Sequence, residues 1–241
     1  MFRHQGRTRT FKHNLRLAAL LSFIAGLVNI TGVLRLNVLT TNVTGHFAFF
    51  AEELVQKNYS VALSFLFFIF SFLIGSFVSS FITEYYVKKG ASAAHKYSMV
   101  IEILMLLGAG FGGSYCYGNS SCSITLAGVL LFSMGIQNSL VTQISESTVR
   151  TTHLTGLFTD LGIELSQLFF YKRKEQREKL FKSIKIRMAI IACFFLGCVI
   201  GGFMFSFFEL RTLLIASVLL FVALTYDVIL YKYYRFIRRA R

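Results

Sequence analysis

Long apolar runs separated by short polar segments make up nearly the whole chain. Six runs each have about 20 residues, the helix length that crosses a hydrocarbon core of about 30 Å. They are Leu15 to Leu34, Ser60 to Thr83, Ser98 to Cys116, Ser123 to Gln143, Met188 to Phe208 and Thr212 to Tyr231. The first run is too long for a secretory signal and no A-x-A cleavage pattern follows it, so it is predicted to be retained. The pattern predicts an all-α polytopic membrane protein with six full transmembrane helices, in a single membrane domain over residues 1–241.

Two further apolar segments are shorter and carry acidic residues. Phe47 to Leu54 contains two glutamates, and Phe158 to Phe170 contains Asp160 and Glu164. A carboxylate near the centre of a spanning helix costs about 2.5 to 3.5 kcal/mol on insertion scales. The sequence therefore predicts two short re-entrant helices or half-helices here rather than full spans.

A threonine-rich stretch that contains a glycine precedes each short segment. Residues 40–46 read TTNVTGH and residues 151–157 read TTHLTGL, at an offset of 111 residues. We call these two stretches the Thr-Gly breaks. Because the chain contains no proline, interruption of a helix at these places depends on Gly, Thr and Asn.

The Thr-Gly breaks belong to a longer internal repeat. GLVN at 26–29 precedes the first break, and GIQN at 135–138 precedes the second. Downstream, FLIGSFVSSF at 72–81 matches FFLGCVIGGF at 194–203, at an offset of 122 residues. The basic cytoplasmic loop predicted over 171–187 supplies the additional residues of the second copy.

The two predicted copies cover about residues 15–117 and 123–231. Each contains three full spans, and because three is odd, the second copy is inverted across the membrane relative to the first. Inverted repeats with interrupted helices near the midplane are the recurrent architecture of secondary transporters. In an alternative arrangement both short segments cross fully, which gives eight spans and parallel repeats.

The net charge of +14 is concentrated in segments that flank the apolar runs. Of the 25 Lys and Arg residues, five lie in 1–16, three in 84–97, eight in 172–187 and five in 232–241. The positive-inside rule places such segments, and with them both termini, in the cytoplasm. Anionic lipid headgroups are sufficient partners for these charges, so no nucleic acid is expected. The eight-span alternative instead puts the 84–97 segment outside.

The two breaks are the predicted substrate-binding site of a transporter for a small molecule or an ion. Thr44 and Thr155 are predicted N-caps of the short helices, and Gly45 and Gly156 permit backbone angles that other residues avoid. A helix that begins inside the bilayer offers N–H groups to an anion, whereas threonine hydroxyls and freed carbonyls suit a cation, and the sequence leaves both open. The site residues are Thr40, Thr41, Thr44, Gly45, Thr151, Thr152, Thr155 and Gly156.

Three titratable residues near the breaks are candidates for coupling transport to protons. His46 and His153 flank the breaks and titrate near neutral pH, although a histidine hydrogen-bonded to a neighbouring helix is an equal interpretation. Asp160 lies about 6 Å along the helix from the second motif glycine and is predicted to be a buried acid. Glu53 and Glu164 lie about 12 Å from their motif glycines and are predicted to be interfacial.

Other polar and small residues within the runs have structural interpretations. Asn29, Asn138, Glu102 and Asp227 are expected to face the bundle interior. Small residues at Gly75 and Ser79, and at Gly197 and Gly201, are expected to pack helices together. Cys193 and Cys198 are expected to be buried as small apolar residues, while Cys116 and Cys122 lie on the predicted external side, where a disulfide is permitted.

No nucleotide-binding loop, zinc helix or nucleophile elbow occurs in the sequence. We therefore predict no enzyme, no catalytic residues, no metal and no cofactor. The expected partners are the lipid bilayer, with its anionic headgroups, and an unidentified small solute or ion; the sequence also permits a homo-oligomer. The alternative function is a membrane scaffold or sensor that transports nothing.

The stretches SFIAGLVNITGVLRLNVLTTNVTGHFAFFAEEL and SMGIQNSLVTQISESTVRTTHLTGLFTDLGIEL carry a resemblance to a known family. The chain resembles the YoaK-like family of bacterial membrane proteins, known as domain of unknown function 1275, from about Leu15 to Tyr231. The resemblance implies a location in the bacterial inner membrane. Family members typically read Thr-Gly-Asn at the first break and have an acidic residue in the first-span motif, where this chain has His46 and Asn29. The resemblance to this family implies no established substrate or catalytic residue.

Overall fold

The computed structural model describes residues 10–90, 94–116 and 118–239, and it describes their side chains as far as residue 226, except that of Ser114. Most of the basic amino-terminal segment, Asp227 and the basic side chains from Lys232 onward are therefore outside the part described. Within the described residues the chain is helical and has no strand. The helices are α1 (Phe11–Leu36), α2 (Val43–Val55), α3 (Tyr59–Lys88), α4 (His95–Gly112), α5 (Ser120–Ile144), α6 (Leu154–Phe170), α7 (Lys174–Phe208) and α8 (Thr212–Arg239), with single 3₁₀ turns η2 (Gly113–Cys116) and η3 (Glu209–Arg211).

Four helical stretches of the described chain are long and apolar enough to cross a membrane. They are α1, α3, α5 and a continuous stretch from Lys174 to Tyr226, which comprises α7, η3 and the first part of α8. The predicted span at Ser98–Cys116 corresponds to α4 and η2, but α4 does not reach this measure, since it has 18 residues that include Lys96 and Glu102. The chain is thus a multi-pass helical membrane protein by helix length and hydropathy.

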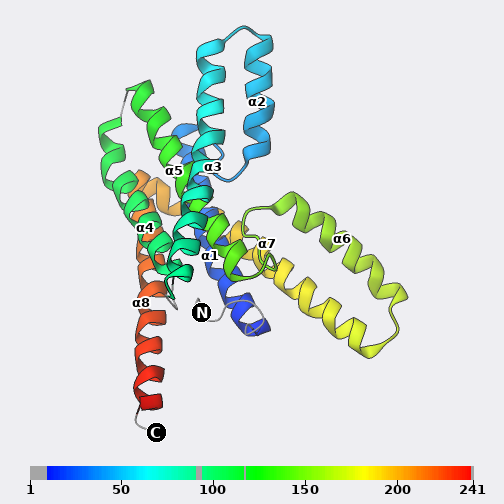
Figure 1. Ribbon diagram of the computed structural model, residues 1–241. Helices are drawn as coiled ribbons and strands as arrows, with labels where there is room; N and C mark the ends of the chain where they lie inside the picture. The colour runs from blue at the N-terminus through cyan, green and yellow to red at the C-terminus, as the bar shows by residue number, and fades with distance from the viewer. Residues whose placement is uncertain (1–9, 91–93, 117, 240–241) are drawn as a thin grey trace.

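The two short helices lie where the sequence predicts them. α2 has 13 residues and α6 has 17, which at 1.5 Å per residue makes them about 20 and 25 Å long. Each packs as a hairpin against the beginning of the long helix that follows it, α2 on α3 and α6 on α7. Figure 1 shows these two hairpins extending from the bundle in different directions, α2 with α3 at the top and α6 with α7 at the lower right.

Glycines allow the long helices of the bundle to approach closely. α1 packs along α7, and α3 packs along α5. A Cβ atom at Gly26 of α1 would overlap the carbonyl oxygen of Phe194 in α7, and one at Gly135 of α5 would overlap the carbonyl oxygen of Phe72 in α3. The predicted packing role of the small residues is confirmed at Gly75 and Gly197, where a Cβ atom would also meet the backbone of the facing helix.

Leucine, isoleucine and methionine side chains fill the space between the long helices. The largest fully buried side chains include Leu17, Leu21, Leu27, Met99, Leu130 and Met134. The outward faces are also apolar, and they are rich in phenylalanine, with Phe70, Phe77, Phe203 and Phe207 among the exposed large side chains. An apolar exterior around an apolar core is what a lipid environment requires, because lipid tails replace water at the surface.

The chain turns back into the bundle after α1 and after α5. Asn37 caps α1 in the left-handed region with φ 54°, and Glu146 and Ser147 have φ values of 49° and 61° just after α5. The segments that follow are buried, since Val38 is 8% exposed and Val149 is 0% exposed. The interruptions of the helices therefore begin at asparagine, glutamate and serine, ahead of the motif glycines.

Candidate functional site

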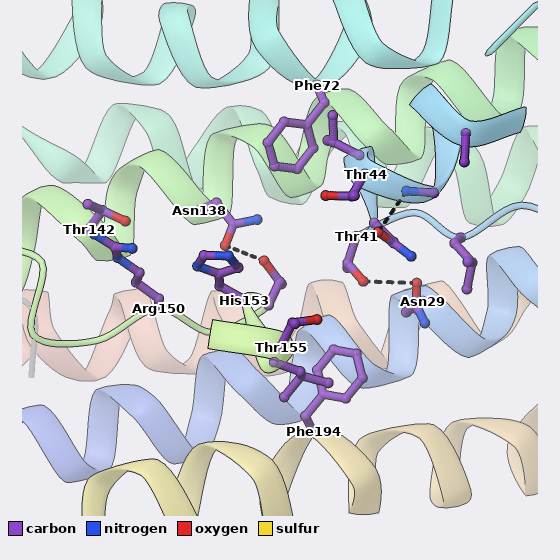
Figure 2. Close-up of a pocket in the computed structure, with 17 residues that line it drawn as sticks. Asn29, Thr41, Thr44, Phe72, Asn138, Thr142, Arg150, His153, Thr155 and Phe194 are labelled. Atoms are coloured by element: carbon purple, nitrogen blue, oxygen red, sulfur yellow. Dashed lines mark hydrogen bonds between the residues drawn. The ribbon is translucent and has the colours of Figure 1, made fainter. Parts of the chain in front are cut away.

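A cavity of about 950 Å³ lies between the two Thr-Gly breaks. Segments from both halves of the chain line it, and Figure 2 shows side chains from the two breaks directed toward one another across it. The lining residues are Asn29, Leu39, Thr41, Asn42, Val43, Thr44, Gly45, Ala48, Phe72, Asn138, Thr142, Arg150, Thr152, His153, Leu154, Thr155 and Phe194. Five of the eight predicted binding residues, namely Thr41, Thr44, Gly45, Thr152 and Thr155, are among them.

Each break is held to the long helix that precedes it by a hydrogen bond to an asparagine, Asn29 of α1 for the first break and Asn138 of α5 for the second. Thr41 donates its hydroxyl to Asn29 Oδ1 at 3.0 Å, and Thr152 donates to Asn138 Oδ1 at 2.7 Å. The Nδ2 atom of Asn138 is buried and has no hydrogen-bond partner among the described residues. The two asparagines therefore face the bundle interior, as predicted, and Asn138 retains an unused donor at the cavity.

The predicted threonine N-caps are wrong. The N-cap of α2 is Asn42, whose side chain accepts the N–H of Gly45 at 3.0 Å. The N-cap residue of α6 is His153, which makes no side-chain capping bond. The short helices begin one residue earlier than the threonines, at Val43 and Leu154, so Thr44 and Thr155 lie within the first turn.

The predicted role of the motif glycines is also wrong. Neither Gly45 nor Gly156 has a positive φ, and both are helical. Their small size is used instead, since a Cβ atom at Gly45 would lie 2.9 Å from the Asn42 side chain, and one at Gly156 would lie 3.2 Å from the His153 ring. Gly156 does not line the cavity.

The two remaining predicted binding residues lie behind the cavity wall. Thr40 and Thr151 are each 0% exposed, and neither lines the cavity. Thr151 lies 3.5 Å from Asn138 Oδ1, while the Thr40 hydroxyl has no hydrogen-bond partner among the described residues. The first threonine of each TT pair is packed inside, and the second is the one that holds its break to the neighbouring helix.

The two candidate histidines have different positions. His46 is 1% exposed, hydrogen-bonds through Nε2 to the carbonyl oxygen of Leu39 at 2.8 Å and packs against Phe65 and Phe68. It does not line the cavity, which matches the structural interpretation of a histidine bonded to its surroundings. His153 lines the cavity, so it is the histidine that a solute can reach.

Asp160 is not the buried acid that the sequence predicts. Its side chain is 51% exposed and lies 3.0 Å from Arg187 Nη1. Glu164, one turn further along α6, accepts two hydrogen bonds from Arg187 at 2.9 and 3.0 Å and one from Ser183 at 2.6 Å. Spacing along the helix did not indicate direction, because both carboxylates contact Arg187 of α7 and neither lines the cavity.

Five polar or aromatic residues that line the cavity were not singled out in the sequence. Phe72 and Phe194 are the first residues of the two matched segments at the offset of 122, so their equivalence in the repeat could have indicated them as site residues. Nothing in the sequence pattern marked Asn42 or Thr142 as a site residue. Arg150 immediately precedes the second break, and among the described residues it is the only charged one that lines the cavity.

Other candidate groups lie away from the cavity. Glu102 in α4 is 0% exposed, and its carboxylate oxygens have no hydrogen-bond partner among the described residues. Cys116 and Cys122 form a disulfide between η2 and the start of α5, while Cys193 and Cys198 are free and partly buried. Within the described part of the chain, no cluster of three or more His, Cys, Asp or Glu residues is arranged to hold a metal ion.

The long apolar helices and the apolar exterior define a multi-pass α-helical membrane protein by helix length and hydropathy. The family of proteins of unknown function DUF1275 matches residues 17–226, and the chain belongs to this family. The resemblance inferred from the two break-containing stretches is thereby confirmed. No curated protein and no solved structure matches the chain.

Proposed function

We propose that this protein is a membrane transporter that binds a small solute or ion in the cavity between the two Thr-Gly breaks. The observation that carries the proposal is the cavity itself, which holds about 950 Å³ and is lined by hydroxyl and amide groups from both breaks. The side chains of Thr44 and Thr155 are exposed at the cavity rather than buried, so their hydroxyl groups are available to a solute, and a concave site with a few convergent polar groups is typical of small-molecule binding.

Contacts that recur at equivalent positions support an internal repeat. Gly26 on Phe194 and Gly135 on Phe72 are the same contact after exchange of the two halves. The Thr41–Asn29 bond likewise corresponds to the Thr152–Asn138 bond. In our proposal α2 and α6 re-enter the membrane without crossing it and α4 crosses it, so each half has three full spans and the second half is inverted relative to the first. Such repeats permit a central site to open to either side in turn.

The distribution of charge and the disulfide support one orientation in the membrane. Basic residues lie around the end of α3 and the start of α7, which occupy the lower part of Figure 1 with the end of α8. The Cys116–Cys122 disulfide lies between α4 and α5, toward the upper part. Disulfides persist on the oxidising side of the bacterial inner membrane, and basic segments favour the cytoplasmic side. In our proposal the start of α1 and the end of α8 therefore face the cytoplasm.

Accessibility of a cavity residue from both sides of the membrane tests the transport proposal even while the substrate is unidentified. Thr155→Cys places a thiol at the cavity, and Thr159→Cys places one a turn further along the same helix, at an exposed position that does not line the cavity, as a matched control. Both are made with Cys193→Ala and Cys198→Ser, which leaves no other free thiol. A membrane-impermeant thiol reagent is applied to intact cells and, separately, to inside-out vesicles.

A transporter exposes its central site to each side in turn, so Thr155→Cys should react in both preparations, and more than Thr159→Cys does. A static scaffold has no need to expose one position to both sides. Reaction of Thr155→Cys from one side only, or from neither, would contradict the transport proposal.

A further inference from the structure

One side of the cavity is cationic and has no counter-charge. Arg150 lines the cavity with its side chain exposed, and it has no ion pair or hydrogen bond with any described residue. None of the lining residues of the described chain is acidic. Figure 2 shows Arg150 beside Thr142 and His153, on the side of the cavity away from Asn29. A guanidinium in a polar cavity without a carboxylate attracts an anion.

The fold does not require a charge at this position. At the offset of 111 residues, Arg150 corresponds to Leu39, which also lines the cavity and accepts the hydrogen bond from His46 through its carbonyl group. The first half of the molecule forms its break with a leucine at the equivalent place. Arg150 is therefore available for binding rather than needed for packing.

The same half of the cavity also keeps unsatisfied hydrogen-bond donors. Asn42 caps the start of α2, whereas the start of α6 has no side-chain cap, so its first N–H groups and the helix dipole remain available to a ligand. The unpartnered Nδ2 of Asn138 is a further donor at the cavity. Arg150, the start of α6 and Asn138 thus contribute donors and positive charge to one half only.

Two aromatic rings line the cavity on either side of these polar groups. Phe72 of α3 and Phe194 of α7 both line it, and Figure 2 shows them above and below the hydroxyl and amide groups. A ligand that reaches Arg150 therefore has apolar surface available for the rest of its structure.

We propose that the cavity binds a small organic anion, with its acidic group at Arg150 and the start of α6 and its apolar part between Phe72 and Phe194. This inference names the class of solute for the site of the proposed function and rests on that site. It requires anion binding, which is measured separately from transport.

Thermal unfolding of the purified protein with three probes of the same shape tests the charge preference. The probes are benzoate, benzamide and benzylamine, which are anionic, neutral and cationic, each at about 10 mM and constant sodium chloride, a concentration chosen to exceed a Kd in the millimolar range. Unfolding is followed with a dye that fluoresces on reaction with thiols, because Cys193 and Cys198 are partly buried in the folded protein and report its opening. The variants are Arg150→Gln and Arg150→Lys, with Arg211→Gln as the exposed control.

Benzoate should raise the unfolding midpoint of the unmodified protein by about 2 to 4 °C, a shift typical of a ligand present well above its Kd. Benzamide and benzylamine should not raise it. The shift should be lost in Arg150→Gln, retained in part in Arg150→Lys and unchanged in Arg211→Gln. Equal shifts with benzamide, no shift with benzoate, or a full shift in Arg150→Gln would overturn the inference.

The unmodified protein alone keeps the inference testable if Arg150→Gln does not fold, because the choice between benzoate, benzamide and benzylamine needs no variant. Failure of anion binding with two-sided access at Thr155→Cys would overturn the substrate class and leave transport standing. Benzoate binding through Arg150 with one-sided access would support the anion site and overturn transport.

Discussion

At the residue scale, glycines decide how closely the long helices approach. Gly26, Gly75, Gly135 and Gly197 each face a backbone carbonyl group of the neighbouring helix, where a Cβ atom would overlap it. A backbone carbonyl in a helix cannot move aside without disturbing its own helical hydrogen bond. A Cβ atom at any of these four positions therefore requires the facing helix to shift, whereas at Gly108 a Cβ atom would have no neighbour within 4 Å.

Gly26→Ala should lower the stability of the protein by about 1 to 3 kcal/mol, the usual cost of overpacking a close contact. Gly108→Ala adds the same methyl group to α4 where there is open space, so it should be neutral or slightly stabilising. Thermal unfolding midpoints in detergent, followed by the same thiol-reactive dye, compare the two variants. Equal midpoints would mean that the close approach of α1 to α7 is not limiting for stability.

At the element scale, the two short helices are attached to their long neighbours by different chemistry. In the first hairpin, Phe49 of α2 packs on Phe65 of α3 with ring centroids 5.4 Å apart. The equivalent residues of the second hairpin are Asp160 and Arg187, which form an ion pair at 3.0 Å. The same pair of positions therefore forms an aromatic contact in the first half and an ion pair in the second half. The ionic version suits the half that we place next to the cytoplasm.

Glu164→Gln should loosen α6 from α7. Glu164 is 12% exposed and accepts hydrogen bonds from Arg187 and Ser183, and loss of a hydrogen bond to a charged group costs about 1.5 to 3 kcal/mol. Hydrogen–deuterium exchange across residues 154–170 should therefore accelerate about 10- to 100-fold, since each 1.4 kcal/mol is about a factor of ten. Glu52→Gln, on the exposed face of α2, is the control and should change exchange little. Unchanged exchange in α6 would show that apolar contacts alone hold it.

At the scale of the whole molecule, the short helices determine the topology. If α2 and α6 re-enter the membrane, the turn after α2 and the end of α3 lie on opposite sides, and the end of α3 shares a side with the α6–α7 connection. If both short helices cross fully, the end of α3 moves to the outside. The proposed site depends on the first arrangement, because only then do the breaks from inverted halves meet near the midplane.

Labelling of single cysteines distinguishes these topologies. In the background with Cys193→Ala and Cys198→Ser, Lys57→Cys in the α2–α3 turn should react with an impermeant thiol reagent in intact cells. Lys89→Cys, at the end of α3, should react only after the cells are opened. Reaction of Lys89→Cys in intact cells would favour eight spans and would remove the argument for a site between inverted halves.

Much of the fold was readable from the sequence because its signals are local. α1, α3, α5 and α7 each overlap an apolar run, and α2 and α6 cover the two short segments that carry carboxylates. The region of the site was readable as well, since Thr41, Thr44, Thr152 and Thr155 line one cavity. The helix starts were misjudged because Asn42 competes with Thr44 as a cap, and capping geometry is decided by one or two residues.

The sequence by itself determined that the chain spans a membrane and interrupts its helices twice, because hydrophobic length and the positions of threonine, asparagine and glycine are written along one dimension. Only the tertiary structure decided which side chains face the cavity. His46 and Asp160 turn toward the helices packed beside them, while Arg150, Phe72 and Phe194 meet from three separate segments. The rotation of a short helix about its axis is set by packing against residues distant in sequence. The spacing of residues within that helix carries no information about those contacts.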